Sequence, residues 1–426
     1  MPALVPPPPA QYVEHLGPSS YPGRLRGLYG GSLWLEPSFH GLQWPYMTRT
    51  GVGVSGSAWV DTGYEKITSE SPNVMGTTRY LQQARAVLRV TPTYVNGRFF
   101  IQAQAELVAN GCQSTGSSTC DVGGAGTVDT DDLWVRIGEW NRWDLKVGRF
   151  EGWELYHTGM GLDVNTLERR GATLDNALAP DYYGVNFMHD RPKSAGTGYV
   201  ALHGYPSDIL RIELLGELGT SNIASAGDNF LGGRPSAILD LGWVKLKAGY
   251  EYLRETSGGQ EQIAGVKTTW PNKLTKSGFG GAVQFVLDPY VEFGANVGRG
   301  SQVFINTQGS PDDTQNFTWT SVGGFANLRV ASLFHAGRPG ALEDLLLGGG
   351  FNWTTRYDSH RAGTNDPDYA AHLQIFGAVQ YLIAKQLFVK AVLAYARADF
   401  DPSGATADEI FSNTMLSARV RLMYLY

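Results

Sequence analysis

The sequence predicts an all-β fold, a transmembrane antiparallel β-barrel of about 16 strands with short periplasmic turns and long outer loops. Apolar residues alternate with polar or small ones along most of the 426 residues, which is the period of a β-strand. Many alternating runs exceed the ~5–6 residues of a globular strand and reach the ~9–11 residues of a membrane-crossing strand. Short and long connections between the predicted strands also alternate along the chain, as in outer-membrane barrels.

Composition excludes several other classes of protein. No apolar stretch reaches the ~18 residues of a transmembrane helix, and a chain with 42% hydrophobic and 12% aromatic residues is too apolar to be disordered. The net charge of −6 comes without blocks of Lys or Arg, so we expect no nucleic-acid partner. The N-terminus has neither a basic start nor an apolar core, so we expect that this form of the chain lacks a signal peptide.

The chain divides into a short arm and a barrel. Residues 1–48 begin with a Pro-rich run and lack the alternation, which predicts a periplasmic or lumenal arm. The barrel is predicted over residues 49–426. Its expected strands are 49–61, 78–92, 98–110, 129–139, 141–150, 182–190, 197–217, 235–243, 245–254, 276–287, 290–300, 316–333, 344–356, 369–383, 386–400 and 411–426.

One of these strands is ambiguous. The stretch 197–217 contains Gly-Tyr-Pro-Ser-Asp, which could be a turn between two strands. We interpret it as one bulged strand, because Val200, Leu202 and Leu214 keep the same parity and an even number of strands results.

The connections fall into two classes. Short turns are predicted at 93–97, 139–141, 243–244, 287–290, 337–344 and 383–385. Longer loops rich in Gly, Ser, Asp and Asn are predicted at 62–77, 111–128, 151–181, 219–234, 255–275, 301–315, 357–367 and 401–409. This asymmetry is expected when turns lie on the periplasmic side and loops on the outer side.

Tyr and Trp collect near the ends of the predicted strands, where an interfacial girdle would place them. These residues are Trp59, Tyr80, Trp143, Tyr183, Tyr252, Tyr290, Trp353, Tyr357, Tyr381, Tyr424 and Tyr426.

Short motifs point to a family. Residues 143–156 read WDLKVGRFEGWELY, a long loop follows, and residues 181–187 read DYYGVNF. The chain ends on Tyr426 in an alternating strand. Together with the alternating strands, these features resemble the Gram-negative outer-membrane porins over residues 49–426.

This resemblance implies a function and partners. It implies a water-filled channel in the bacterial outer membrane for passive diffusion of small hydrophilic solutes and ions, without catalysis or cofactor. It further implies that loop 151–181 folds inward and narrows the channel, and that Tyr426 replaces the C-terminal Phe read by the outer-membrane assembly machinery. A homotrimer in contact with the lipid bilayer and lipopolysaccharide is the expected assembly.

Charged residues could make the channel selective. Strand parity, with the end of the strand that enters loop 151–181, suggests a basic pore-lining wall of Arg85, Arg89, Arg136, Arg142, Lys146 and Arg149. The constriction loop carries Glu154, Asp163, Glu168, Arg169, Arg170, Asp175 and Asp181. Opposite charges across a narrow gap would select ions. The alternative is that these are ordinary solvated residues without special selectivity.

Other functions remain open. The channel could select one class of solute, an anion or a carbohydrate, and Trp153 or Tyr183 could then contact sugar rings instead of only packing the loop. An outer-membrane enzyme or adhesin and a soluble all-β protein are further alternatives. Neither G-x-S-x-G nor H-E-x-x-H occurs, so we expect no catalytic residues.

Cys112 and Cys120 flank a Gly- and Ser-rich run. We expect a local disulfide, which implies an oxidising compartment, and no metal site, because no His lies between them. Asp-rich runs at 129–132 and 311–313 could bind Ca²⁺ in a loop, but they lack the spacing of a calcium-binding loop.

Overall fold

The computed structural model is a closed all-β barrel of 16 antiparallel strands, which confirms the predicted fold class. It describes residues 50–70, 76–96, 98–114, 127–139, 141–153, 155, 197–220, 229–263, 266–287, 291–305, 314–330, 345–360, 369–384, 387–400 and 411–425. The arm predicted at 1–48 lies outside them.

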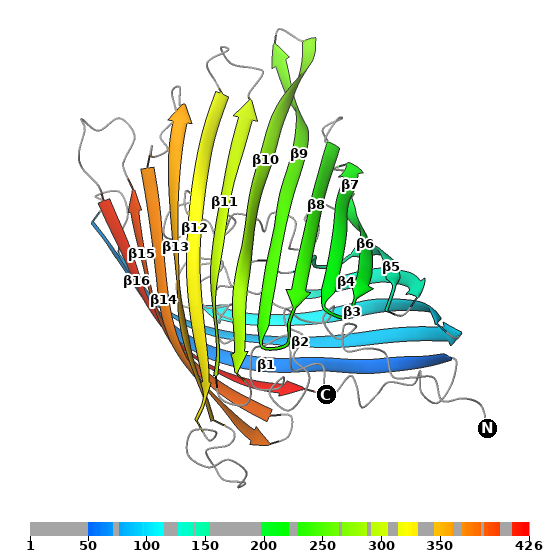
Figure 1. Ribbon diagram of the computed structural model, residues 1–426. Coiled ribbons are helices and arrows are strands. Elements are labelled where there is room, and N and C mark those ends of the chain that lie inside the picture. The colour runs from blue at the N-terminus through cyan, green and yellow to red at the C-terminus, as the bar shows by residue number, and fades with distance from the viewer. Residues whose placement is uncertain are drawn as a thin grey trace, which may run out of the picture.

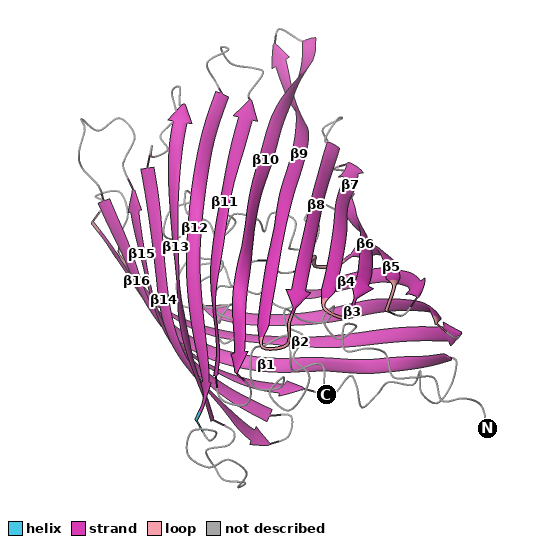
Figure 2. Cartoon of the chain, in the orientation of Figure 1, coloured by secondary structure: helices cyan, strands magenta, loops and turns pink. Residues whose placement is uncertain are grey.

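Strands make up nearly all of the described chain (Figure 2). Their bounds are β1 (Thr50–Ser69), β2 (Thr77–Asn96), β3 (Phe99–Ser114), β4 (Thr127–Glu139), β5 (Trp143–Arg149), β6 (Thr197–Ser207), β7 (Leu210–Thr220), β8 (Asn229–Asp240), β9 (Val244–Ile263), β10 (Val266–Leu287), β11 (Val291–Ile305), β12 (Thr314–Arg329), β13 (Leu345–His360), β14 (Tyr369–Ala384), β15 (Leu387–Phe400) and β16 (Phe411–Leu425). No helix in these ranges is long and apolar enough to cross a membrane.

Each strand pairs with its neighbours in sequence, and the last strand closes the ring on the first. β16 pairs antiparallel with β1 from Ser57 opposite Leu425 to Ser69 opposite Asn413. In Figure 1 the red end of the chain accordingly lies beside the blue one. Closure gives every strand two partners, so the ring offers no open edge to another chain.

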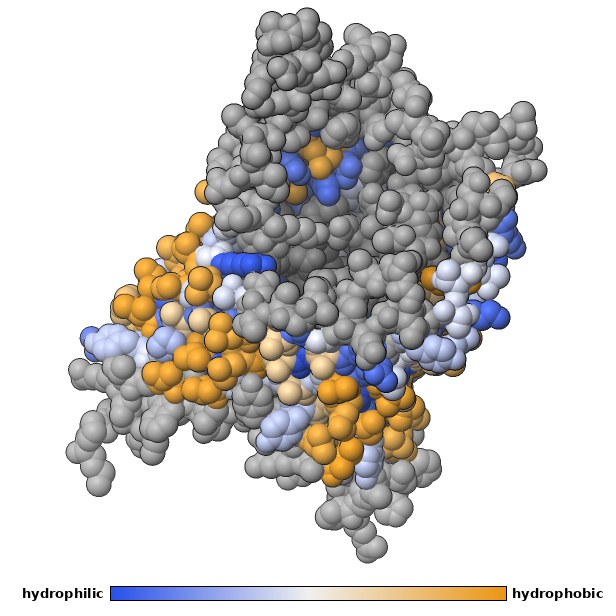
Figure 3. Space-filling view, turned by 180° about the vertical axis from the view of Figure 1, so that it is seen from behind, coloured by the Kyte–Doolittle hydropathy of each residue, from blue (hydrophilic) through white to orange (hydrophobic). Residues whose placement is uncertain are grey.

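The alternation separates an inner face from an outer face. On β16, Arg419 and Arg421 face the interior and are buried, whereas Val420 and Leu422 face outward and are exposed. Figure 3 shows apolar side chains gathered on the outer surface of the described wall. An apolar outer band with a polar interior is the arrangement expected of a barrel surrounded by lipid.

The stretch 197–217 is two strands, so its interpretation as one bulged strand was wrong. β6 and β7 are joined at Asp208 and Ile209, and the Ile209 carbonyl accepts a hydrogen bond of 2.7 Å from the Asp240 backbone N–H. Pro206 lacks an N–H group and suits the end of a strand, and the register shifts beside it, between Gly204 and Ser207. The strand predicted at 182–190 lies outside the described residues, and β5 pairs directly with β6.

The longest strands form a hairpin where a loop was predicted. β9 and β10 have 20 and 22 residues and pair as far as Ile263 and Val266. The predicted loop 255–275 is therefore mostly sheet, and the two strands extend beyond their neighbours in Figure 1. Backbone hydrogen bonds continue the ladder there without an alternating apolar face, which is why the pattern did not show it.

The wall from β5 to β8 is much shorter. β5 has 7 residues and β6 and β7 have 11 each. β4 and β5 also approach closely: a Cβ added to Gly138 would lie 2.3 Å from the Trp143 carbonyl oxygen. Gly148 has a φ of 138°, which disfavours any residue with a Cβ. The shortest part of the wall therefore requires glycine.

Candidate functional site on the inner wall of the barrel

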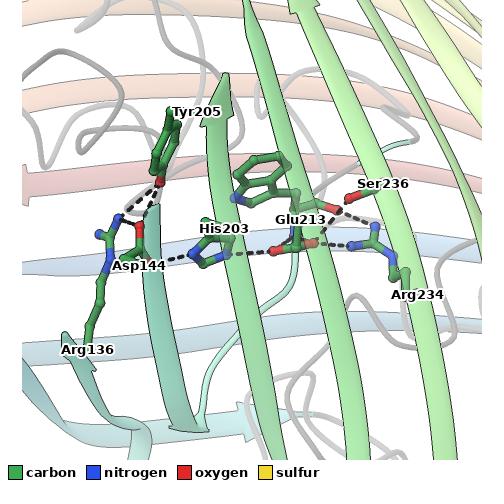
Figure 4. Close-up of polar contacts among 8 residues, drawn as sticks. Arg136, Asp144, His203, Tyr205, Glu213, Arg234 and Ser236 are labelled. Carbon is green, nitrogen blue, oxygen red and sulfur yellow. Dashed lines mark hydrogen bonds and ion pairs between the residues drawn. The ribbon is translucent and has the colours of Figure 1, made fainter. Parts of the chain in front are cut away.

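The β-sheet register aligns polar side chains across the inner face of four strands. Asp144 on β5 is opposite His203 on β6, His203 is opposite Glu213 on β7, and Glu213 is opposite Ser236 on β8. All four face the interior and are buried. Side chains directly opposite in neighbouring strands lie close enough to interact, and Figure 4 shows this row.

Asp144 forms the first node of the row. Its Oδ2 atom lies 2.5 Å from Arg136 Nη2 and accepts a hydrogen bond of 2.9 Å from the Tyr205 hydroxyl. Its Oδ1 atom lies 2.6 Å from His203 Nδ1. Arg136 also donates a 3.1 Å hydrogen bond to the Tyr205 oxygen. Both carboxylate oxygens of this buried group therefore have donors, which buried charges require.

Glu213 forms the second node. Its Oε1 atom accepts hydrogen bonds from Arg234 at 2.9 Å and from the Ser236 hydroxyl at 3.3 Å. Its Oε2 atom lies 3.2 Å from His203 Nε2. Arg234 extends the row to β9, where its Nε lies 2.6 Å from Glu251 Oε1.

The row balances its own charge. His203 faces a carboxylate with each ring nitrogen, and only the imidazolium form has two donors to offer them. In that form positive and negative groups alternate from Arg136 through Asp144, His203, Glu213 and Arg234 to Glu251. The cluster adds little net charge to the channel wall, because each cation contacts a carboxylate.

The chain after β5 turns onto this wall. We call its described residues, 150–153 and 155, the inward segment. The Trp153 backbone N–H donates to both oxygens of Glu213, at 3.0 and 3.3 Å, and its carbonyl accepts from Arg234. The Trp153 indole stacks on the His203 ring, with centroids 5.2 Å apart and planes 8° apart. Trp153 is therefore held by three strands at once.

Apolar contacts also hold the inward segment. Phe150 belongs to a buried cluster on the inner face that the sequence did not predict there; its other members are Trp134, Tyr199, Ala201 and Leu215. The Lys146 ammonium lies 4.0 Å from the Phe150 ring centroid and 4.5 Å from that of Trp134. Leu155 is fully buried beside Gly249 of β9. The interior is therefore partly a hydrophobic core, whereas the alternation predicted polar or small residues on this face.

The predicted basic wall is only partly brought together. Arg85, Arg89, Arg136 and Lys146 share the inner face of β2, β4 and β5, and Arg89 pairs with Glu106 of β3.

Two members of the predicted wall lie elsewhere. Arg142 sits in the turn before β5, where its side chain is 59% exposed and lies 3.1 Å from Glu139. Arg149 is exposed on the parity opposite to Lys146. Parity was misleading at Arg142, because this residue lies outside a strand. Arg149 was included only because it lies at the end of the strand that enters loop 151–181, and that position does not turn it inward.

Most of the predicted loop lies outside the described residues. This holds for Glu154, Asp163, Glu168, Arg169, Arg170, Asp175 and Asp181. Cys120 and Tyr426 also lie outside them, and of Cys112 only the backbone, in β3, is described. The constriction, the disulfide and the C-terminal assembly signal therefore stay predictions.

A second charged cluster lies where the barrel closes. Arg421 of β16 contacts Asp61 of β1 at 2.6 Å, and Arg419 lies 3.7 Å from Asp61 and 3.7 Å from Glu65. The Arg421 guanidinium lies 3.8 Å from the Trp59 ring centroid. Trp59 thus faces inward and does not join the outer aromatic girdle in which it was expected.

The wall half way round the ring from β4–β6 is different in character. The described inner-face side chains of β12 to β14 include no Asp, Glu, Lys or Arg. Asn352 and Gln374 lie opposite one another there, and Ser321 contacts Thr354 at 2.8 Å. A Cβ on Gly350 would meet the Phe376 ring at 2.9 Å, so that ring covers the glycine.

Sequence reasoning missed Asp144, His203, Glu213 and Arg234, although a signal was present. The apolar residues Val200 and Leu202 face outward, so strand parity predicts that His203 faces inward. Glu213 is likewise predicted to face inward, because its neighbour Leu214 faces outward. The error was to look for basic residues on the strands and for acidic residues only in loop 151–181. In the described part of the chain, no group of three or more His, Cys, Asp or Glu side chains is arranged to hold a metal ion, and the calcium hypothesis stays untested.

Comparisons with known proteins agree with the fold. No protein-family model and no curated protein matches the sequence. Among solved structures, the outer-membrane channel DcaP of Acinetobacter baumannii aligns with a TM-score of 0.51 and 11% identity, covering 88% of this chain and 97% of that one. An anion-selective porin from Comamonas acidovorans aligns with a TM-score of 0.50 and 11% identity, covering 88% and 100%. The resemblance to outer-membrane porins thus extends to the fold.

Proposed function

We propose that this chain is an outer-membrane porin, a water-filled channel for passive diffusion of small hydrophilic solutes and ions. The observation that carries the proposal is the closed ring of 16 strands with apolar residues outside and polar residues inside. A ring of this size is too wide for its own side chains to fill completely. Lipid and lipopolysaccharide are the partners that would contact its outer surface.

The channel is proposed to be weakly selective among ions. The cations of the inner row contact carboxylates, Arg136 with Asp144 and Arg234 with Glu213, and Arg421 contacts Asp61 where the barrel closes. Paired charges produce a smaller field along the path than a wall of one sign, and rings of one sign are what selective pores use.

The inner row does not support catalysis. A serine nucleophile needs a histidine base within hydrogen-bond reach. Here both ring nitrogens of His203 face carboxylates, and the hydroxyl of Ser236 donates to Glu213. We therefore propose a channel without enzymatic activity or organic cofactor.

Single-channel recording tests this function. The purified, refolded protein is added to a planar bilayer, and the reversal potential is measured across a salt gradient. We expect large stepwise conductance with a small reversal potential. Correctly folded protein that never conducts would overturn the proposal and favour an anchoring or enzymatic barrel.

A carbohydrate-selective channel is the second candidate. The described inner face of β12 to β14, on which no Asp, Glu, Lys or Arg side chain lies, favours it, because amides such as Asn352 and Gln374 lie near the Phe325 and Phe376 rings. Sugars are bound by such combinations of hydrogen-bonding groups and apolar rings. Saturable block of the ion current by a neutral saccharide would support this candidate, whereas block that only follows solution viscosity would reject it.

We further propose that the barrel forms a homotrimer through its short wall. At ~3.3 Å per residue β5 rises ~23 Å before tilt, less than the ~25 Å apolar band of such barrels requires. This part of the wall is too short to match the apolar layer of the membrane, and contact with another copy of the protein would cover it. Cross-linking and the gel mobility of unheated samples test this, and a species that runs only as a monomer contradicts it.

A further inference from the structure

We infer that Glu213 and Gly249 are positioning residues that hold the inward segment flat against the wall of β6–β9 and thereby keep the channel open. The inference rests on the proposed channel function. Neither residue needs to contact a solute, because each acts through the inward segment.

Glu213 provides the polar half of this attachment. Its carboxylate accepts the Trp153 backbone N–H and also orients Arg234, which donates to the Trp153 carbonyl. The same carboxylate lies 3.2 Å from His203, on which the Trp153 indole stacks. Glu213 thus contacts Trp153 directly and also contacts both side chains that complete its attachment, although Arg234 has a second partner in Glu251 and His203 has one in Asp144.

Gly249 provides the steric half. A Cβ built on Gly249 would lie 2.3 Å from Leu155 Cδ1, 3.1 Å from the Pro235 carbonyl oxygen and 3.2 Å from Ser236 Cβ. Leu155 is fully buried at this point, so it occupies a notch that exists only because residue 249 has no side chain. A branched residue there would push Leu155 away from the wall and toward the channel axis.

The opposite wall explains why this attachment matters. The described inner face of β12 to β14 carries glycine and uncharged polar residues such as Gly323, Ser321 and Asn352, together with the Trp319, Phe325 and Phe376 rings. The inward segment rests on the other side of the ring, so a solute is expected to pass between it and this wall. If the inward segment leaves the wall of β6–β9, the space enclosed by the ring is expected to narrow.

Two substitutions with matched controls test the inference. Glu213→Gln removes the charge that contacts Arg234, and the control Glu139→Gln makes the same change in a surface pair with Arg142, away from the inward segment. Gly249→Val fills the notch, and Gly63→Val adds the same bulk to an inner glycine whose Cβ would meet Arg419 at an ordinary 3.5 Å. Unheated gel mobility verifies that each variant folds.

The readouts are open-channel conductance, the rate of brief closures and the size of neutral polymer that enters. We expect Gly249→Val to lower conductance about twofold, because flux follows the free radius of the pore, and Glu213→Gln to increase brief closures. Both controls should match the parent protein. Adding Leu155→Ala to Gly249→Val should restore conductance, which a general loss of stability would not do.

The outcomes separate this inference from the channel proposal. A parent protein that folds but does not conduct contradicts the proposed function itself. A parent that conducts, with folded Gly249→Val and Glu213→Gln variants that match it in all three readouts, overturns the positioning role. Failure of Leu155→Ala to restore conductance would also overturn it.

Discussion

At the residue scale, the interior is defined by charges that are buried together. Asp144 is fully buried, and its contacts reach Arg136, His203 and Tyr205 on two neighbouring strands. Buried ion pairs gain little net stability over apolar packing, but removal of one partner leaves the other charge poorly solvated. Such a residue is therefore sensitive to substitution even if it never meets a solute.

Asp144→Asn tests this dependence. We expect the free energy of unfolding to fall by about 3–5 kcal/mol, because Arg136 and His203 both lose their ionised partner. Urea unfolding of the folded protein in lipid vesicles measures it. The matched control is Arg142→Gln, whose 59% exposed side chain forms a surface pair with Glu139 worth about 0–1 kcal/mol. Equal losses for the two variants would contradict the prediction.

Individual inner-face residues were predictable only in part. Alternation placed Arg136 and Lys146 on the correct face. It did not show that Arg136 contacts Asp144 or that Lys146 lies over the Phe150 and Trp134 rings. Parity fixes the direction of a side chain, but its partners depend on register and on what packs across the interior.

At the element scale, closure of β1 on β16 is the least local pairing of the barrel. Asp61 serves both Arg421 and Arg419 at this junction, and Arg421 also lies over Trp59. Pairing of distant strands costs loop entropy before contacts form. Side-chain contacts between β1 and β16 are therefore expected to favour closure of the ring, because they offset part of this entropy.

Asp61→Asn is expected to lower the folded fraction during refolding. It removes the carboxylate that holds two guanidinium groups across the junction, and loss of one member of a buried pair costs about 3–5 kcal/mol. A time course of unheated gel mobility measures the folded band. Arg397→Gln, in an exposed pair with Asp399 on β15, is the control. The same folded fraction in both variants would show that the junction closes without this cluster.

Strand boundaries show where the sequence was misleading. Polar composition suggested a loop at 255–275, yet β9 and β10 continue there as paired strands. The apolar alternation ends where contact with lipid would end, whereas backbone pairing continues because it needs no particular side chain. At 197–217 the parity of Val200 and Leu214 was correct, but equal parity on both sides of a tight turn cannot distinguish one strand from two.

At the scale of the whole molecule, charge is arranged unevenly around the ring. The β4–β9 side carries the alternating row from Arg136 to Glu251, whereas the described inner face of β12 to β14 lacks Asp, Glu, Lys and Arg. A solute would therefore meet paired charges on one side and hydrogen-bonding or aromatic groups on the other. Ion selectivity then depends on how completely the charges pair.

Neutralising Arg85, Arg89 and Arg136 together tests whether this wall influences ions. We expect a shift of the reversal potential toward cations, because Glu106 and Asp144 keep their charge while Arg89 and Arg136 lose theirs. The control neutralises Arg142 and Arg149, which do not lie on the inner face of β4 and β5. Unchanged selectivity in the folded triple variant would remove the idea of a selective basic wall.

The sequence by itself determined that this chain forms a membrane-type barrel with an apolar outer face and a largely polar inner face. That information is local, because strand period and side-chain direction are properties of consecutive residues. Only the tertiary structure decided that Asp144, His203 and Glu213 form one row, that Trp153 rests on it, and that Gly249 makes room for Leu155. These contacts join four strands and the segment after β5, and their alignment follows from register around a closed ring, which no local pattern specifies.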